Sequence, residues 1–202
     1  MPRQSSAKQQ MITAARRLFR ERGYLGTSVA DILAESGAPR GSVYFHFPGG
    51  KEELAAEVAI AHTADLIALI NRLTDRESSA SAVLAGFVAH FRDQIAASDY
   101  REGCPVAPIV LETASTTPRL AAVTRRGFQD LIATMSARLA EKGLQPENAQ
   151  ELATLAVTGM EGALVVSRAL QDPQPFEALT ARLTEAAESC GARKVVGAGQ
   201  AA

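Results

Sequence analysis

The residues best suited to chemistry lie in one short stretch, GSVYFHFPGGK, which runs from Gly41 to Lys51. Four rings occupy the consecutive positions from Tyr44 to Phe47, in a chain that is only 5% aromatic. Arg40 precedes them with a guanidinium, and Lys51 follows with an ammonium. Such side chains donate hydrogen bonds to phosphates, bond to base edges and pack against a thymine methyl group. The stretch therefore predicts contact with nucleic acid.

A short helix is expected to carry these residues, with successive side chains pointing about 100° apart. Val43 and Phe47 are four positions apart and are predicted to face inward, while Phe45 fits either face. Gly41 leaves room for a close backbone approach. Lys51 begins the next helix, where its ammonium and the free backbone N–H groups can hold a phosphate. The side chains predicted to face outward are Arg40, Ser42, Tyr44 and His46.

Two earlier helices are predicted to position this segment. The first ends at Gly23, and its apolar face consists of Met11, Ala15, Leu18 and Phe19. The second starts at Thr27 or Ser28, either of which offers an N-cap, with Ser28 and Asp31 as a capping-box-like pair, and it ends at Gly37. Pro39 is predicted to open the third helix. A turn of about four residues between the second and third helices is the spacing of a helix-turn-helix.

The rest of the chain is also predicted to be helical, because good helix formers dominate and β-branched alternation is scarce. The predicted helices are 51–71, 80–97, 105–115, 118–142, 147–171 and 175–190, with a polar break at 74–81. The sequence thus indicates an all-α fold. Its expected parts are a three-helix DNA-binding domain (1–50), a body of roughly six helices (51–191) and a flexible tail (192–202).

Charge is unevenly distributed along the chain. Residues 1–51 contain eight Lys and Arg side chains and three acids, whereas the remaining residues contain 13 basic and 19 acidic side chains. The formal net charge of −1 therefore combines a +5 head with a −6 body. This asymmetry favours an anion-binding head, although a fluctuation in solvated surface charge gives the same pattern.

Membrane insertion and export are not expected. No stretch approaches about 20 uninterrupted apolar residues, and MPRQSSAKQQ lacks the apolar region of a secretory signal. We therefore expect a cytoplasmic protein with reduced thiols at Cys104 and Cys190. Cys104 lies between Gly103 and Pro105 at a helix start, where a lowered thiol pKa would suit redox sensing. The alternative is that it packs as a small hydrophobic side chain.

The first ~50 residues resemble the DNA-binding domain of TetR/AcrR-type transcriptional repressors. The matching segments are MITAARRLFRERGYLGTSVADILAESG, then GSVYFHF, then KEEL, and their spacing matches as a unit. The chain departs from that pattern at 48–50, where many members place only two residues before the lysine. The pattern, and more loosely the segment GCPVAPIVLETAS, resembles the YxaF/LmrA-like branch.

The resemblance implies a residue-by-residue assignment of DNA contacts. Thr27 and Ser28 would touch phosphates from the start of the second helix, and Lys51 would clamp another phosphate. Arg40, Gly41, Ser42, Tyr44 and His46 would enter the major groove or contact its walls. The family also implies a homodimer that binds a palindromic double-stranded operator and is released by a small-molecule effector.

The body offers candidates for effector binding and dimerisation. A mostly apolar pocket with a few polar anchors is expected, and the structural core is the alternative for each apolar residue. The candidate ligand-binding residues are Phe87, His90, Phe91, Glu112, Met135, Met160, Glu161 and Leu164. Gly159 and Gly162 each cost about 1 kcal/mol of helix stability relative to alanine, which close helix approach would offset. Dimerisation is therefore expected through the last two helices, with the last contributing Phe176, Leu179, Leu183 and Ala187.

Two other classes of function are alternatives to DNA binding. An enzyme would use Cys104 or a His/Glu pair, but the sequence contains no nucleophile elbow, phosphate loop or carboxylate pair at a suitable spacing. The three histidines, at positions 46, 62 and 90, are scattered, so neither a metal nor another cofactor is expected. A helical protein–protein adaptor would not need the basic head. The sequence favours a ligand-responsive repressor.

Overall fold

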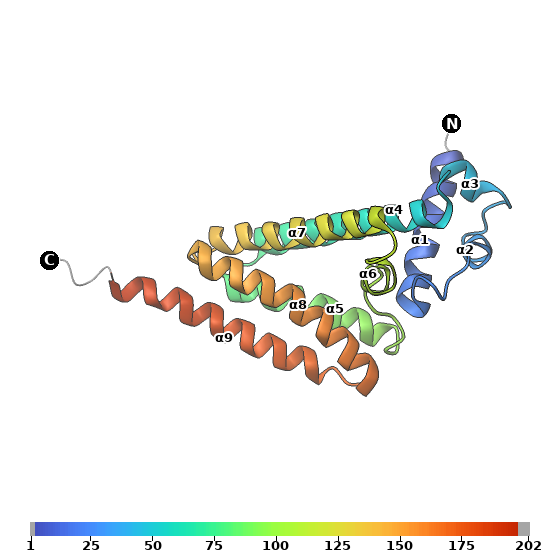
Figure 1. Cartoon of the computed structure of the whole chain (residues 1–202). Coiled ribbons are helices and arrows are strands. Elements are labelled where there is room, and N and C mark those ends of the chain that lie inside the picture. The colour runs from blue at the N-terminus through green and yellow to red at the C-terminus, as the bar shows by residue number, and fades with distance from the viewer. Residues whose placement is uncertain (1–2, 198–202) are drawn as a thin grey trace. The chain divides into compact units, whose positions relative to one another are not determined.

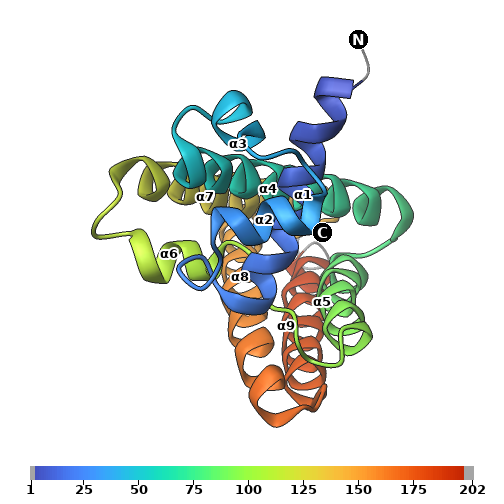
Figure 2. The ribbon, with the colours of Figure 1, turned by 90° about the vertical axis from the view of Figure 1, so that its right-hand side faces the viewer.

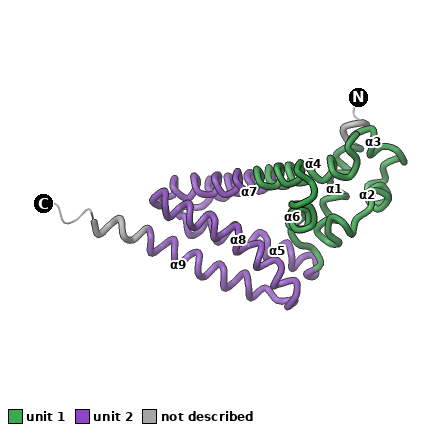
Figure 3. The backbone as a smooth tube through the Cα atoms, viewed as in Figure 1, with its two compact units in different colours: residues 1–64, 101–128 green, residues 65–100, 129–202 purple. Residues whose placement is uncertain are grey.

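The computed structural model describes the backbone of residues 3–197 and the side chains of residues 7–190. In this part of the chain, nine helices and their connecting turns account for the structure, which confirms the predicted all-α class. The helices form two compact units, one of residues 1–64 and 101–128, the other of residues 65–100 and 129–202 (Figure 3). Each unit is therefore built from segments that are far apart in sequence.

The first unit contains the helix-turn-helix and the helices packed around it (Figure 1). These are α1 (Arg3–Arg22), α2 (Val29–Ser36), α3 (Ser42–His46), α6 (Ala107–Thr113) and the first parts of α4 (Gly50–Arg76) and α7 (Pro118–Glu141). One apolar core joins them. Its most deeply buried large side chains are Met11, Leu18, Phe19, Ile32, Val43, Phe47, Leu54, Val58, Ile109 and Leu120.

The predicted start and end of α2 are confirmed. Ser28 is the N-cap, and its hydroxyl accepts a hydrogen bond from the backbone N–H of Asp31, while the Asp31 carboxylate accepts from the Ser28 backbone. Gly37 follows the helix with φ of 65°, a left-handed conformation that suits glycine. The inward faces predicted for α1 and α3 are also buried. Local sequence signals thus predict α2 and the inward faces of α1 and α3 correctly.

Three predicted boundaries are wrong. The third helix begins at Ser42 rather than at Pro39, because the Pro39 carbonyl accepts from the Ser42 N–H in a turn and Gly41 then has φ of 91°. α4 runs to Arg76 through the start of the predicted polar break, where the Thr74 hydroxyl donates to the Ile70 carbonyl. α9 (Gln174–Gly197) continues past residue 190 into the expected tail, of which residues 198–202 lie outside the described part.

The second unit is a helical bundle of α5 (Ala80–Ala97), α8 (Pro146–Leu170), α9 and the later parts of α4 and α7. Figure 1 and Figure 2 both show α5, α8 and α9 lying side by side, and these three helices contact one another. α8 is the one described helix that is long and apolar enough to cross a membrane, and 44% of its apolar window is buried. Packing inside the bundle accounts for the buried part of that apolar character.

Candidate nucleic-acid interface

The recognition segment α3 presents two rings to solvent. Val43 and Phe47 are 0% exposed and anchor the helix in the core, whereas Tyr44 is 66% exposed and Phe45 is 68% exposed. Large apolar groups that stay exposed beside an anchored helix mark an interaction surface. The predicted orientations of Val43, Phe47 and Tyr44 are confirmed. Phe45 fitted either face in the sequence and was absent from the predicted contacts, but it lies on the exposed face.

The remaining candidates on this segment surround the two rings. Arg40 and Gly41 are exposed, and Ser42 and His46 are half-buried. The His46 ring lies edge-on to Phe45, with ring centroids 5.0 Å apart. At Gly41 an added Cβ would meet nothing within 4 Å, so its positive φ of 91° is what favours glycine there. We name these residues, Arg40, Gly41, Ser42, Tyr44, Phe45 and His46, the α3 surface.

The structure contradicts the predicted phosphate contact of Thr27. This residue is 0% exposed. Its hydroxyl donates to the Gly23 carbonyl at 2.8 Å, and its backbone N–H donates to the Tyr24 carbonyl at 3.3 Å. Both donors therefore stabilise the turn between α1 and α2, and neither faces solvent.

Ser28 is exposed, but its hydroxyl is already engaged. It donates to the Asp31 carboxylate at 2.6 Å and accepts from the Asp31 backbone N–H at 3.1 Å. The hydrogen bonds from the Ser28 side chain and backbone lower the pKa of Asp31. A phosphate contact by Ser28 stays a prediction, and such a contact would place the phosphate next to an ionised carboxylate.

Lys51 is held by an aromatic ring. Its Nζ lies 4.2 Å from the centroid of the Tyr24 ring, a cation–π distance. Burial lowers the pKa of Lys51, and the carboxylates of Glu112 and Asp31 oppose that change. Tyr24 in turn packs edge-on against Phe19, with ring centroids 5.6 Å apart. Lys51 therefore has a defined position at the start of α4, over the Tyr24 ring.

Glu112 is placed differently from the expectation. It was predicted to anchor a ligand, but it lies in the first unit, where its Oε2 accepts from the Leu25 backbone N–H at 2.5 Å. An added Cβ on Gly23 would lie 2.8 Å from Glu112 Oε1, so the carboxylate packs closely over this turn. Glu112 therefore links α6 to the α1–α2 turn, and the expected ligand role does not fit this arrangement.

The other candidate ligand residues lie in the second unit, on α5, α7 and α8. The buried ones are Phe87, Phe91, Met135, Met160 and Leu164. Phe87 and Phe91 form an edge-to-face pair with centroids 5.2 Å apart, and the exposed His90 ring lies 5.3 Å from that of Phe91. Glu161 is half-buried. The arrangement thus supplies an apolar interior with two polar groups on its helices.

Salt bridges inside the first unit reduce the charge excess seen in the sequence. Lys8 pairs with Glu57 at 2.9 Å, and Arg20 pairs with Glu102 at 3.4 Å. Both acids come from outside the basic head of residues 1–51. The field that this head presents to an anion is therefore weaker than its formal charge of +5 indicates.

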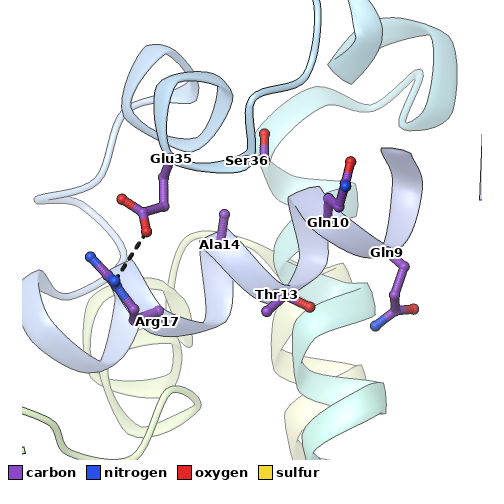
Figure 4. A pocket seen from close by; sticks show the side chains of 7 residues that line it. All are labelled: Gln9, Gln10, Thr13, Ala14, Arg17, Glu35 and Ser36. Carbon is purple, nitrogen blue, oxygen red and sulfur yellow. Dashed lines mark ion pairs between the residues drawn. The ribbon is translucent and has the colours of Figure 1, made fainter. Parts of the chain in front are cut away.

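A surface hollow of about 550 Å³ lies between α1 and α2 (Figure 4). Its lining residues are Gln9, Gln10, Thr13, Ala14, Arg17, Glu35 and Ser36. Arg17 bridges the two helices through an ion pair of 3.1 Å with Glu35. Such exposed pairs are worth about 0–1 kcal/mol. Arg17, one of the cations of the basic head, therefore has an intramolecular partner.

Comparison with known protein families agrees with this geometry. Residues 11–58 match the model of bacterial regulatory proteins of the TetR family. Residues 80–182 match the model of the C-terminal domain of LmrA/YxaF-like transcriptional regulators. The two matches leave residues 59–79, within and just after α4, between them. The expected functional boundary at residues 50/51 stays a prediction, since the compact units divide the chain elsewhere.

Individual relatives support the same assignment. An HTH-type transcriptional regulator of Mycobacterium tuberculosis is 34% identical over 84% of this chain and 88% of its own length. The HTH-type regulator YxaF of Bacillus subtilis is 32% identical over 87% of this chain and 92% of its own. Among solved structures, a TetR-family regulator from Agrobacterium tumefaciens has the same fold, with a TM-score of 0.79, 23% identity, and coverage of 90% of this chain and 97% of its own.

The fold and the α3 surface define a DNA-binding transcriptional regulator of the helix-turn-helix class rather than an enzyme. The chain belongs to the TetR family, and its C-terminal domain is of the LmrA/YxaF-like type. The family assignment that the sequence suggested is thereby confirmed.

Proposed function

We propose that this protein is a repressor that binds a palindromic operator as a homodimer and is released by a small-molecule effector. The observation that carries the DNA-binding role is the α3 surface, in which Tyr44 and Phe45 are exposed while Val43 and Phe47 fix the helix in the core. A rigidly anchored helix with exposed rings, a guanidinium and an imidazole suits a major groove. Repression takes place in the cytoplasm, where the operator lies.

The proposed dimer uses an apolar stripe on α8. The exposed residues Leu155, Val165, Val166 and Leu170 are 45–66% exposed and fall on one side of the helix together with Gly162. An added Cβ on Gly162 would meet nothing within 4 Å, whereas one on Gly159 would lie 2.5 Å from Leu179 of α9. Gly159 thus serves packing within the chain. Gly162 is left for close approach by a second copy.

The expected contribution of α9 to this interface needs correction. Phe176, Leu183 and Ala187 are 0–3% exposed within the chain itself. Leu179 is half-buried against Gly159. These residues pack inside the second unit and cannot also contact a partner. The proposed interface therefore consists of the α8 stripe, with the exposed side of α9 alongside it.

We propose that the effector enters the second unit among Phe87, Phe91, Met135, Met160 and Leu164, with His90 and Glu161 as polar anchors. Glu112 is omitted, because its carboxylate holds the α1–α2 turn. An effector with a large apolar surface and one or two polar groups suits this interior. It lowers DNA affinity only if it binds the DNA-incompetent conformation more tightly.

The test is fluorescence anisotropy with the DNA that flanks the protein's own gene, across a salt series. We expect tight binding whose affinity falls steeply with salt, as phosphate contacts release counterions. Tyr44→Ala should abolish the preference for this DNA. Ile60→Ala, which also truncates an exposed apolar side chain of the first unit (54% exposed), is the matched control and should bind as the wild type does. Equal binding by both variants would remove α3 as the recognition helix.

A further inference from the structure

A cluster of polar side chains lies in the first unit, where residues 101–106 meet α1 and α4. It contains Arg16 and Arg20 from α1, His62 from α4, and Glu102 and Cys104 from the connecting segment. His62 is 4% exposed and Cys104 is 8% exposed. Neither residue belongs to the α3 surface or to the proposed effector site. The cluster therefore needs its own explanation.

The hydrogen bond between Arg16 and His62 determines which nitrogen of the imidazole carries the proton. A guanidinium nitrogen of Arg16 lies 2.8 Å from His62 Nδ1. Because a guanidinium only donates, Nδ1 must accept, and a neutral imidazole then carries its proton on Nε2. This Nε2 lies 4.0 Å from Cys104 Sγ. The imidazole thus directs its Nε2–H toward the sulfur. Its other nitrogen, Nδ1, is occupied by the hydrogen bond from Arg16.

Two N–H groups and one guanidinium near the sulfur favour its anion. The Val106 backbone N–H donates to Cys104 Sγ at 3.4 Å, and His62 supplies a second N–H. Arg20 adds positive charge: its pKa is lowered by burial and by Arg16, while Glu102 and Cys104 counteract this. N–H donors and neighbouring cations lower the pKa of a thiol and create the thiolate that acts as a nucleophile.

We propose that Cys104 is held as a thiolate and is a modification site for small peroxides, which oxidise it to a sulfenic acid. The thiolate sulfur attacks one peroxide oxygen, an S–O bond forms, and the O–O bond breaks. Hydroxide leaves and takes up the proton that the thiol had released, so one thiol and one hydrogen peroxide give one sulfenic acid and one water. The low exposure of Cys104 admits small oxidants and excludes bulky ones.

The test compares the two cysteines of the reduced full-length protein. Hydrogen peroxide is added for timed intervals and removed with catalase, and the protein is then unfolded in urea that contains dimedone, which traps sulfenic acids at either cysteine. Mass spectrometry follows the peptides containing Cys104 and Cys190. Cys190 is an internal control because it is more exposed than Cys104. We expect labelling of Cys104 on the order of tenfold faster than that of Cys190, since an ordinary thiol is only a few per cent ionised at neutral pH. Equal or faster labelling of Cys190, or no labelling of Cys104, would overturn the proposal.

Variants of His62 test whether the cluster causes this reactivity. His62→Leu removes the N–H that faces the sulfur and should slow Cys104 labelling severalfold while leaving Cys190 labelling unchanged. His62→Gln, which keeps an N–H donor, should restore part of the rate. Circular dichroism confirms that both variants are folded. If folded His62→Leu reacts at the wild-type rate, the imidazole does not activate Cys104 and the assigned geometry is wrong.

Discussion

Two surfaces of this protein expose apolar groups to a similar extent but differ in everything around them. Tyr44 and Phe45 on α3 are 66% and 68% exposed, and Val165 and Leu170 on α8 are 66% and 62% exposed. The rings on α3 stand among a guanidinium, an imidazole and glycine on a helix of five residues. The side chains on α8 are aliphatic and follow one side of a 25-residue helix around Gly162.

The difference indicates which partner each surface fits. Aromatic rings beside cationic and hydrogen-bonding groups suit bases and phosphates, which offer both apolar faces and acceptors. An aliphatic stripe with a glycine offers no hydrogen-bond donors. Its free energy of association comes from removing apolar area from water when it packs against a similar stripe. Neighbouring exposed apolar groups thus mark an interaction surface, and the residues around them determine the class of partner.

The largest expected effect comes from placing a charge on the α8 stripe. Val165→Asp should raise the dimer dissociation constant on the order of 100-fold, because the interface would have to bury an unpaired carboxylate. Sedimentation velocity measures the monomer fraction. Gln150→Asp, at an exposed position outside the stripe on the same helix, is the control and should remain dimeric. A dimeric Val165→Asp variant would place the interface elsewhere.

The second-largest expected effect concerns Phe45, which is absent from the DNA contacts predicted from the sequence. Phe45→Ala should weaken operator binding roughly tenfold, in the range of about 1–3 kcal/mol for a base contact, with a smaller effect on random DNA. Thermal unfolding should be nearly unchanged, because the ring is 68% exposed. Competition binding with operator and random duplexes measures both affinities. An unchanged operator preference would restrict the recognition surface to Tyr44 and its polar neighbours.

A substitution at Lys51 separates phosphate contact from base recognition within the proposed DNA-binding region. Lys51→Ala should weaken operator and random DNA by a similar, smaller factor and reduce the salt dependence by about one unit of slope, as for the loss of one phosphate contact. Lys51→Arg should keep most of the salt dependence. A change in sequence preference without a change in salt slope would assign Lys51 to base recognition instead.

The smallest effect concerns the link between α6 and the α1–α2 turn. Glu112→Ala leaves the Leu25 N–H without its acceptor and should lower the free energy of unfolding by about 1 kcal/mol. Glu112→Gln keeps a carbonyl oxygen at this position and should restore most of that loss. Urea denaturation measures both. Equal stability of all three proteins would show that water replaces the carboxylate without cost.

Features encoded by neighbouring residues could be predicted from the sequence. The Ser28–Asp31 capping box, the glycine after α2 and the inward face of α1 all follow from spacing over a few residues. Contacts between distant segments could not. Leu25 and Glu112 are 87 positions apart, so no local pattern indicates that Glu112 should be removed from the effector candidates. The predicted phosphate contact of Thr27 was wrong for a similar reason. A position next to a helix N-terminus does not reveal whether the hydroxyl points toward solvent or toward the Gly23 carbonyl.

The α8 glycines show the same limit in a single helix. Both were interpreted as sites of close approach to a second copy, yet only the position of Leu179 on α9 separates the intramolecular Gly159 from the open Gly162. The burial of Phe176, Leu183 and Ala187 likewise follows from packing of α9 on α5 and α8. Periodicity identifies an apolar face, and tertiary packing decides whether the chain itself covers it.

The central claim is that the α3 surface recognises a specific DNA sequence. The most direct measurement is the ratio of affinities of the wild-type protein for the DNA flanking its own gene and for a random duplex of equal length, at one physiological salt concentration. A specific regulator predicts a ratio of about 10³ or more. Equal affinity for the two duplexes would contradict the claim, because the α3 surface would then bind only the phosphate backbone.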